Sequence, residues 1–224
     1  WEEGVLECLY FDNDINGFTD FLNKNLSSVS TSRTVSSFCT HLTHNTGNTT
    51  HHKFCPNPYN YVKSFDLGNF DNLPNVNKRL LDEINKFEMG SRNQPLLVGG
   101  EQTILDIFSQ NSTLLNNFKF FLFDQAKIYK EIFVNEDDLF IKEWPNSLKI
   151  NGWCVVMNSN GYLYPHNHPK GWLSGCYYIK VPDKKNLSEG NIEFSLSNSN
   201  FPAEQDKIDT LQIETKESRL SLIH

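Results

Sequence analysis

The chain has 224 residues, of which 38% are hydrophobic, and this is enough to build one domain with a full core. Its formal net charge of −7 argues against the basic surface that general binding to nucleic acid or to an anionic membrane requires. We therefore expect no nucleic-acid or membrane partner.

The cysteine content and the N-terminus bear on the cellular compartment. Five cysteines are widely spaced and form no CxxC motif, so a disulfide framework is not expected. The first residues, Trp1 to Gly4, lack the basic and apolar regions of a signal peptide, and no run of about 18 apolar residues occurs. These features predict a cytoplasmic protein.

The first 55 residues are expected to be mixed in structure. Weak alternation over 5–10 predicts a strand, and apolar residues at helical spacing over 14–26 predict a helix. The polar run 27–37 is typical of a loop or an edge strand. Six cysteines and histidines then fall between Cys39 and Cys55, but their spacing matches no zinc-site pattern. We expect a packing loop there, without zinc.

The middle of the chain is expected to be helical. Apolar residues recur every three or four positions over 75–87 and again over 112–134, where Ser112 or Asn111 is the expected N-cap. The second of these helices carries a broad apolar stripe that is expected to buttress a sheet. Gly99 to Thr103 lacks the lysine and the spacing of a phosphate-binding loop, so we expect a tight turn that leads into a short helix.

From Asn146 onward the apolar period changes to two. The predicted strands cover 148–158, 162–166, 172–181, 191–197, 209–214 and 219–223. Helices followed by a run of short strands indicate an α+β domain with a β-sandwich or jelly-roll core.

The sharpest chemical signal is the pair His166 and His168 at the end of a predicted strand. In an extended strand, residues i and i+2 project to the same face, so both imidazoles can bind one metal ion. Pro165 and Pro169 flank the pair and stiffen its backbone.

The motifs around this pair follow one another in a recognisable order. His166-Asn167-His168 precedes Gly171 to Ile179 (GWLSGCYYI) and Glu189 to Phe194 (EGNIEF). Upstream stand the segments FCPNP at 54–58, GGEQT at 99–103 and NGW at 151–153. This series resembles the 2-oxoglutarate/Fe(II)-dependent oxygenase family, in a prolyl-4-hydroxylase-like branch with an HxH motif.

The resemblance implies a fold and a chemistry. The fold is one domain over 1–224, a double-stranded β-helix (jelly roll, cupin-like barrel) over 146–224 with buttressing helices and loops over 1–145. The chemistry is hydroxylation by dioxygen with Fe(II) and 2-oxoglutarate, the iron being held by His166 and His168. Candidates for the co-substrate pocket are Trp153, Tyr162, Ser174, Tyr178 and Arg219, with Met157 and Cys176 also possible inward positions. The parity that faces inward on each strand stays open.

By the register of that family, the distal histidine and the carboxylate-binding cation fall beyond His224, the last residue. We therefore expect a site without its third ligand, a catalytically silent fragment, and a strand edge that is covered or paired in a homodimer. If the fragment does turn over, another residue completes the site, and His224 itself is one candidate. Two other classes share the barrel, a cupin-type metalloprotein and a non-catalytic binding module, and metal content would separate them.

Overall fold

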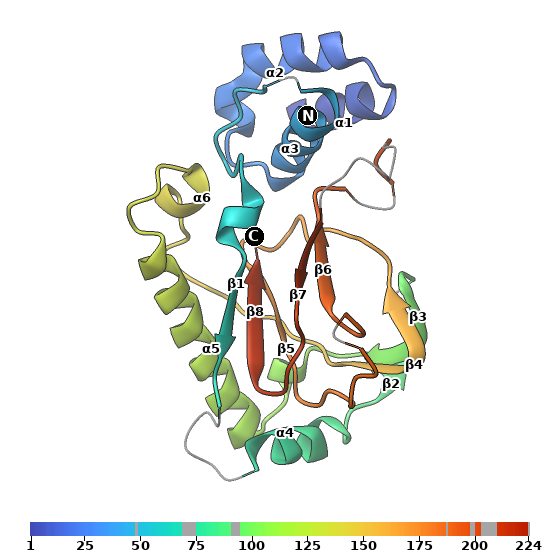
Figure 1. The fold of residues 1–224 in the computed structure, drawn as a ribbon. Helices are drawn as coiled ribbons and strands as arrows, with labels where there is room; N and C mark the ends of the chain where they lie inside the picture. Colours follow the sequence, from blue (N-terminus) through green and yellow to red (C-terminus); the bar gives the residue numbers. More distant parts are fainter. Residues whose placement is uncertain are drawn as a thin grey trace.

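The computed structural model describes residues 1–47, 49–68, 75–90, 95–186, 188–197, 200–202 and 210–223. Helices dominate the first half of the chain, and short antiparallel strands dominate the second half (Figure 1). The expectation of a mixed α+β protein is confirmed. None of the helices within these ranges combines the length and the apolar composition needed to cross a bilayer.

Three helices form the N-terminal end of the molecule, at the top of Figure 1: α1 (Glu2–Phe11), α2 (Ile15–Val29) and α3 (Arg33–Thr46). They enclose a core of their own, in which Leu6, Tyr10 and Phe38 are buried. The predicted helix over 14–26 is confirmed. The strand predicted over 5–10 is wrong, because Leu6 and Tyr10 stand one helical turn apart and are both buried by α2 and α3.

Helix α3 overturns two further expectations. The predicted loop or edge strand over 27–37 belongs to the end of α2 and the start of α3, and the predicted loop from Cys39 begins inside α3. Val35, Phe38 and Leu42 lie at helical spacing and are buried, so burial of this stripe outweighs the low helix propensity of the intervening serines and threonines. Ser32 caps the helix by accepting a hydrogen bond from the Val35 amide.

The middle of the chain supports the sheets. It contains η1 (Pro58–Tyr61), β1 (Lys63–Asp66), α4 (Val76–Ile84), β2 (Met89–Gly90), β3 (Leu97–Thr103), η3 (Ile107–Ser109), α5 (Thr113–Ile132) and α6 (Leu139–Lys142). The helices predicted over 75–87 and 112–134 are confirmed, and Ser112 caps α5 through the Leu115 amide.

The expectation of a turn and short helix at 99–103 is wrong, because these residues lie in strand β3. Gly99 has a φ of +64°, and the strand register shifts at this point. A side chain at Gly99 would place its Cβ 3.2 Å from the Gly161 Cα, so the two glycines allow the strands to approach. The glycines therefore serve a bulge within a sheet.

The C-terminal part supplies β4 (Val155–Leu163), β5 (Ser174–Tyr177), β6 (Ile192–Ser195), β7 (Thr210–Ile213) and β8 (Arg219–Ile223). The strands predicted over 148–158 and 162–166 form one strand, β4, that ends at Leu163. The strands predicted over 172–181, 191–197 and 209–214 are confirmed within shorter limits, and the strand over 219–223 is confirmed at its full length. Asp209, in the predicted strand 209–214, lies outside the described residues.

The strands pair antiparallel in the orders β1-β8-β5, β2-β3-β4 and β6-β7. In the part of the chain that the structure describes, these are separate small sheets and do not close into a barrel. Helix α5 runs alongside the first sheet (Figure 1) and buries Tyr129 in the same core as Leu220 and Leu222 of β8. The predicted buttressing role of this helix is thus what the packing shows.

Candidate metal centre

The two histidines of the HxH motif converge on one point. His166 and His168 follow β4 in a loop, and their Nε2 atoms are 3.1 Å apart. Two nitrogens that each lie about 2.1 Å from one ion are about 3.0 Å apart at neighbouring corners of an octahedron and about 3.4 Å apart in a tetrahedron. The spacing therefore fits two adjacent ligands of a six-coordinate ion.

The other ring nitrogen of His166 fixes its tautomer. Its Nδ1 lies 2.7 Å from the backbone carbonyl oxygen of Tyr164. A carbonyl can only accept a hydrogen bond, so Nδ1 carries the hydrogen and donates it. The neutral ring then has its lone pair on Nε2, which is the form that a metal ligand requires.

His168 is held in a comparable way. Its Nδ1 lies 3.0 Å from Ser174 Oγ, and its ring packs edge-on against Trp153 with the centroids 5.7 Å apart. Desolvation of the ring, and then the neighbouring His166, lower the pKa of His168. Both effects favour the neutral imidazole. When Nε2 binds a metal, Nδ1–H can donate to the Ser174 hydroxyl, so this serine can orient the ring of a metal-bound His168.

A tight turn carries the second histidine. The Gly171 amide donates to the His168 carbonyl oxygen at 2.9 Å and closes the turn over 168–171. Beyond it, Trp172 Nε1 donates to the Phe140 carbonyl oxygen at 3.1 Å. The turn that carries His168 is therefore attached, through Trp172, to the core that contains Phe140.

The sheet next to this loop has two chemically different faces. In an antiparallel pair, directly opposed residues share a face and successive residues alternate. Leu220 lies opposite Tyr177 on one side and Phe65 on the other, and all three pack toward the helices. This face of β1-β8-β5 is apolar.

The opposite face is polar and includes Ser174, the partner of His168. Cys176 lies opposite Ser221 on this face, and the Ser221 hydroxyl is 3.0 Å from the Ser64 hydroxyl of β1. Tyr178 continues the alternation, since its amide donates to the Arg219 carbonyl oxygen. Register thus places the candidates Ser174, Cys176, Tyr178 and Arg219 on one face of the sheet, and their role in a co-substrate pocket stays a prediction.

Arg219 already has a carboxylate partner on that face. Its Nε and Nη2 donate to the two oxygens of Asp66 at 2.7 and 3.2 Å, and its Nη1 donates to the Glu214 carbonyl oxygen at 2.9 Å. Asp66 stands directly opposite Arg219 in the register. The pair lowers the pKa of the Asp66 carboxyl and raises the pKa of Arg219.

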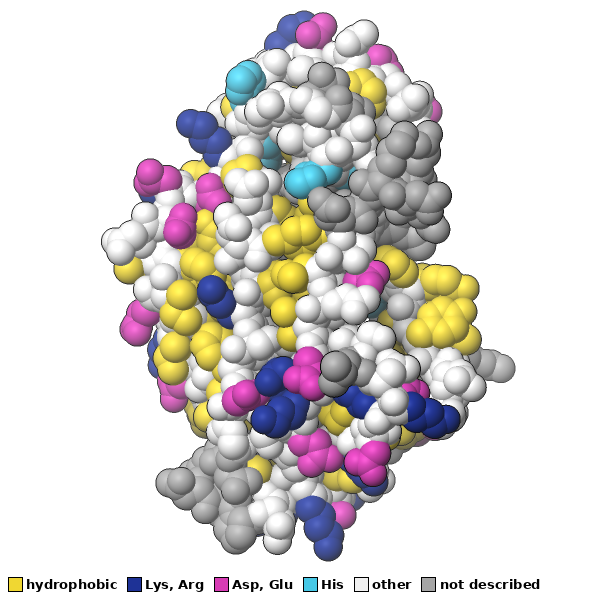
Figure 2. All heavy atoms as spheres, viewed as in Figure 1, with side chains coloured by type: hydrophobic (Ala, Val, Ile, Leu, Met, Phe, Trp, Pro, Cys, Tyr) yellow, Lys and Arg dark blue, Asp and Glu magenta, His cyan; other side chains and the backbone are white. Residues whose placement is uncertain are grey.

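The candidates on β4 lie along a different sheet. Tyr162 packs edge-on against Tyr164, with the hydroxyl groups 3.2 Å apart, and Met157 stands opposite Gly100. Both are close to half exposed, and Figure 2 shows hydrophobic side chains gathered over the β3–β4 region. Tyr164 joins this group to the metal centre, because its carbonyl accepts from His166.

Of the six cysteines and histidines of residues 39–55, Cys39, His41, His52 and Cys55 are buried, whereas His44 and His51 are exposed. Tyr10 Oη lies 2.6 Å from His41 Nδ1, and the Asn45 amide contacts His41 Nε2, so both ring nitrogens are engaged. His52 Nε2 lies 3.0 Å from the Val29 carbonyl oxygen. Burial raises the pKa of Cys39 to about 12, which keeps the thiol protonated. The expectation that this segment holds no zinc stays a prediction.

The third ligand is not identified by the geometry. Among residues 1–47, 49–68, 75–90, 95–186, 188–197, 200–202 and 210–223, no three His, Cys, Asp or Glu side chains form a group that could hold a metal ion. His224, the residue that the sequence offers as a substitute third ligand, lies outside the described residues.

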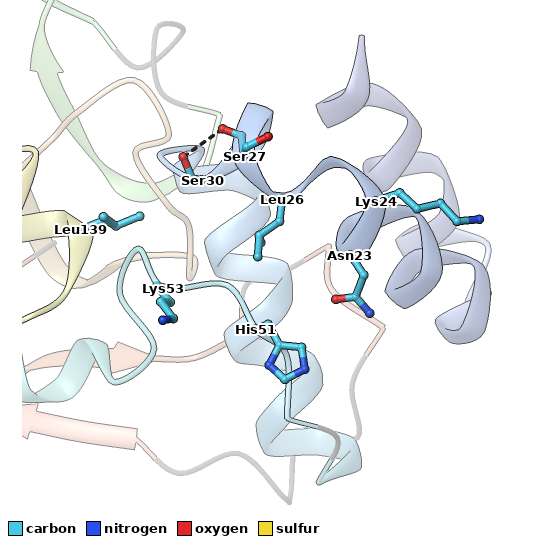
Figure 3. Close-up of a pocket in the computed structure, with 8 residues that line it drawn as sticks. All are labelled: Asn23, Lys24, Leu26, Ser27, Ser30, His51, Lys53 and Leu139. Atoms are coloured by element: carbon cyan, nitrogen blue, oxygen red, sulfur yellow. Dashed lines mark hydrogen bonds between the residues drawn. The ribbon is translucent and has the colours of Figure 1, made fainter.

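A separate hollow lies between helix α2 and the segment 51–53 (Figure 3). It has a volume of about 480 Å³, and its polar lining includes Lys24, His51 and Lys53. The sequence gives no sign of it, because its walls come from segments that are distant in the chain. No residue of β4 to β8 lines it, so it is not part of the metal centre.

The site is thus a convergent histidine pair beside the polar face of an antiparallel sheet. Comparison with protein-family models gives a match of residues 151–223 to the family described as "Putative 2OG-Fe(II) oxygenase". The matched segment runs from before β4 to the end of β8 and contains both histidines. Comparisons with curated proteins and with solved structures gave no match.

Proposed function

We propose that the chain carries the iron- and co-substrate-binding part of an Fe(II)- and 2-oxoglutarate-dependent dioxygenase, in a prolyl-4-hydroxylase-like branch with a double-stranded β-helix. One observation carries the proposal: His166 and His168 present Nε2 atoms 3.1 Å apart while both Nδ1 atoms are engaged by the protein. The family match over 151–223 supports it.

In this proposal His166 and His168 hold the iron, and the polar sheet face holds the co-substrate. When bound, iron would activate dioxygen, the oxidant: one oxygen atom would go to 2-oxoglutarate as it is oxidised to succinate and CO2, and the other would hydroxylate a C–H bond of a small molecule or a protein side chain. The chain's own residues orient and shield. The Tyr164 carbonyl keeps His166 in its ligating tautomer, the Ser174 hydroxyl can accept the Nδ1 proton of His168 when a metal takes Nε2, and Trp153 covers one edge of His168.

The co-substrate is proposed to lie along Ser174, Tyr178 and Arg219, with Trp153 and Tyr162 toward the open side. Asp66 takes the Nε and Nη2 donors of Arg219, so a co-substrate carboxylate that binds this edge of the guanidinium would have to displace Asp66. Displacement is chemically plausible, since one carboxylate replaces another and the bidentate geometry is kept. Asp66 would then act as a competitor that weakens co-substrate binding.

The test is a calorimetric titration with Co(II), a redox-stable substitute for Fe(II). We expect binding by the unsubstituted chain and its loss in His166→Ala and His168→Ala. The matched control is His51→Ala, which removes an exposed histidine outside the site. Equal Co(II) affinity in all four proteins would refute the metal centre. Succinate formation from 2-oxoglutarate with Fe(II) then tests the reaction itself.

A further inference from the structure

Arg33 joins the N-terminal helices to the loop that carries His168. It lies in the first turn of α3, outside the segment that matches the oxygenase family. Its Nε donates to the Pro169 carbonyl oxygen at 2.7 Å, although the two residues are 136 positions apart. Its guanidinium also lies over the Trp172 ring, 5.7 Å from the centroid. One side chain thus contacts two residues of the turn that follows the second ligand.

The first contact is inside the turn and the second directly follows it. The Gly171 amide and the His168 carbonyl close the turn without using the Pro169 carbonyl oxygen, which accepts from Arg33 instead. Trp172 is fixed by the Phe140 carbonyl and by edge-on contact with the Phe54 ring, 5.2 Å between centroids. Arg33 therefore ties the turn to an already rigid ring.

The base from which Arg33 reaches the turn is itself fixed. Ser32, its neighbour, accepts from the Val35 amide and donates to a Glu3 carboxylate oxygen at 2.7 Å. Val35 is fully buried in the core of the three helices. The first turn of α3 is therefore held by a cap and by packing, so it is rigid enough to position the 168–172 turn.

We propose that Arg33 is a positioning residue for the metal centre. It orders the 168–172 turn so that His168 Nε2 stays within ligand spacing of His166, and it makes metal affinity depend on the N-terminal helices. The inference rests on the proposed function, because the turn matters in this way only if the pair binds a metal. Arg33 acts through His168 and does not itself contact the ion's position.

The test compares Arg33→Ala and Arg33→Lys with the unsubstituted chain. We expect Co(II) binding to weaken roughly three- to tenfold in Arg33→Ala, below the roughly 10–100-fold typical of a direct second-shell partner. Arg33→Lys should recover part of the affinity, because an ammonium can reach the carbonyl but cannot also stack on the indole as a guanidinium does. Arg79→Ala, in the exposed part of α4, controls for loss of one positive charge.

A second measurement uses metal-free protein. Amide hydrogen exchange over residues 166–172 should be faster in Arg33→Ala than in the unsubstituted chain, and unchanged in Arg79→Ala. Equal Co(II) affinity and equal exchange in Arg33→Ala would overturn the inference. If the unsubstituted chain binds no Co(II), the proposed function fails, and the metal role of Arg33 fails with it. If the unsubstituted chain binds Co(II) and Arg33→Ala binds it equally tightly with unchanged exchange, the inference fails and the proposed function stands. Should Arg33→Ala not fold, the same comparisons are decided by Arg33→Lys.

Discussion

Ser174 gives the sharpest test of how the protein prepares its histidine pair. Its hydroxyl lies 3.0 Å from His168 Nδ1, and it is the side chain through which β5 contacts the metal centre. In the metal-free pair, His168 Nε2–H can donate to His166 Nε2 while Nδ1 accepts from Ser174. When the metal takes Nε2, the proton must reside on Nδ1, where the same hydroxyl can accept it. The serine can therefore serve both states.

Ser174→Ala should weaken Co(II) binding by roughly tenfold, the lower end of the range for second-shell partners. We expect the lower end because His168 is exposed, so that water can replace a lost neutral hydrogen bond worth about 1 kcal/mol net. A tenfold change corresponds to about 1.4 kcal/mol.

The assay is calorimetric titration with Co(II) at about pH 7.5, roughly one unit above the ordinary histidine pKa. Ser64→Ala is the matched control, because it removes a hydroxyl from the same sheet face that bonds to Ser221 and not to the pair. Ser174→Thr keeps the hydroxyl and should retain most of the affinity. If Ser174→Ala binds Co(II) as tightly as Ser64→Ala, His168 is not oriented by this hydroxyl.

Three further predictions concern other groups. His41 is buried, and its pKa is lowered to about 4 by desolvation first and by the neighbouring His44 second. Between about pH 6.5 and 4 the unfolded chain therefore binds more protons than the folded chain, so the free energy of unfolding should fall by about 3 kcal/mol as the pH falls through this range. Denaturant unfolding of His41→Gln should lack this dependence on pH. Asp66→Asn should strengthen 2-oxoglutarate binding to the Co(II) form severalfold and Arg219→Met should weaken it, whereas equal calorimetric affinities would exclude Arg219 as the carboxylate-binding residue. Elemental analysis should find no zinc that is lost on Cys39→Ser and Cys55→Ser, since one zinc per chain removed by these changes would contradict a packing role.

The sequence predicted the elements whose apolar residues stand out from their neighbours. In α4, Val76, Leu80 and Ile84 recur at intervals of four, and five of the six residues between them are polar, so the helical period is dominant. In α1, six residues of weak alternation fit a strand as well as a helix, and only packing against α2 and α3 decides between them. Local pattern is thus sufficient where one period is dominant and fails where tertiary burial makes the choice.

The structure brings the two histidines that the sequence paired close together, but by a geometry that the sequence did not predict. The i, i+2 spacing suggested that His166 and His168 face the same way in a strand, yet β4 ends at Leu163 and the pair lies in the following loop. Their rings converge because the Tyr164 carbonyl and the Ser174 hydroxyl hold them from opposite sides. Neither partner could be assigned from sequence spacing, since each depends on how the loop folds back.

The contacts that sequence reasoning missed entirely are those between distant segments. Asp66 and Arg33 are 153 and 136 residues from their partners Arg219 and Pro169, and no local pattern encodes such pairs. Both nevertheless matter for the proposed chemistry. Asp66 forms an ion pair with Arg219 on the polar sheet face, and Arg33 holds the turn after His168. In the proposed function, residues outside the matching segment 151–223 therefore contribute to the site. On that proposal, metal affinity should depend on Arg33 of α3 and co-substrate affinity on Asp66 of β1, and variants confined to the matched segment would miss both contributions.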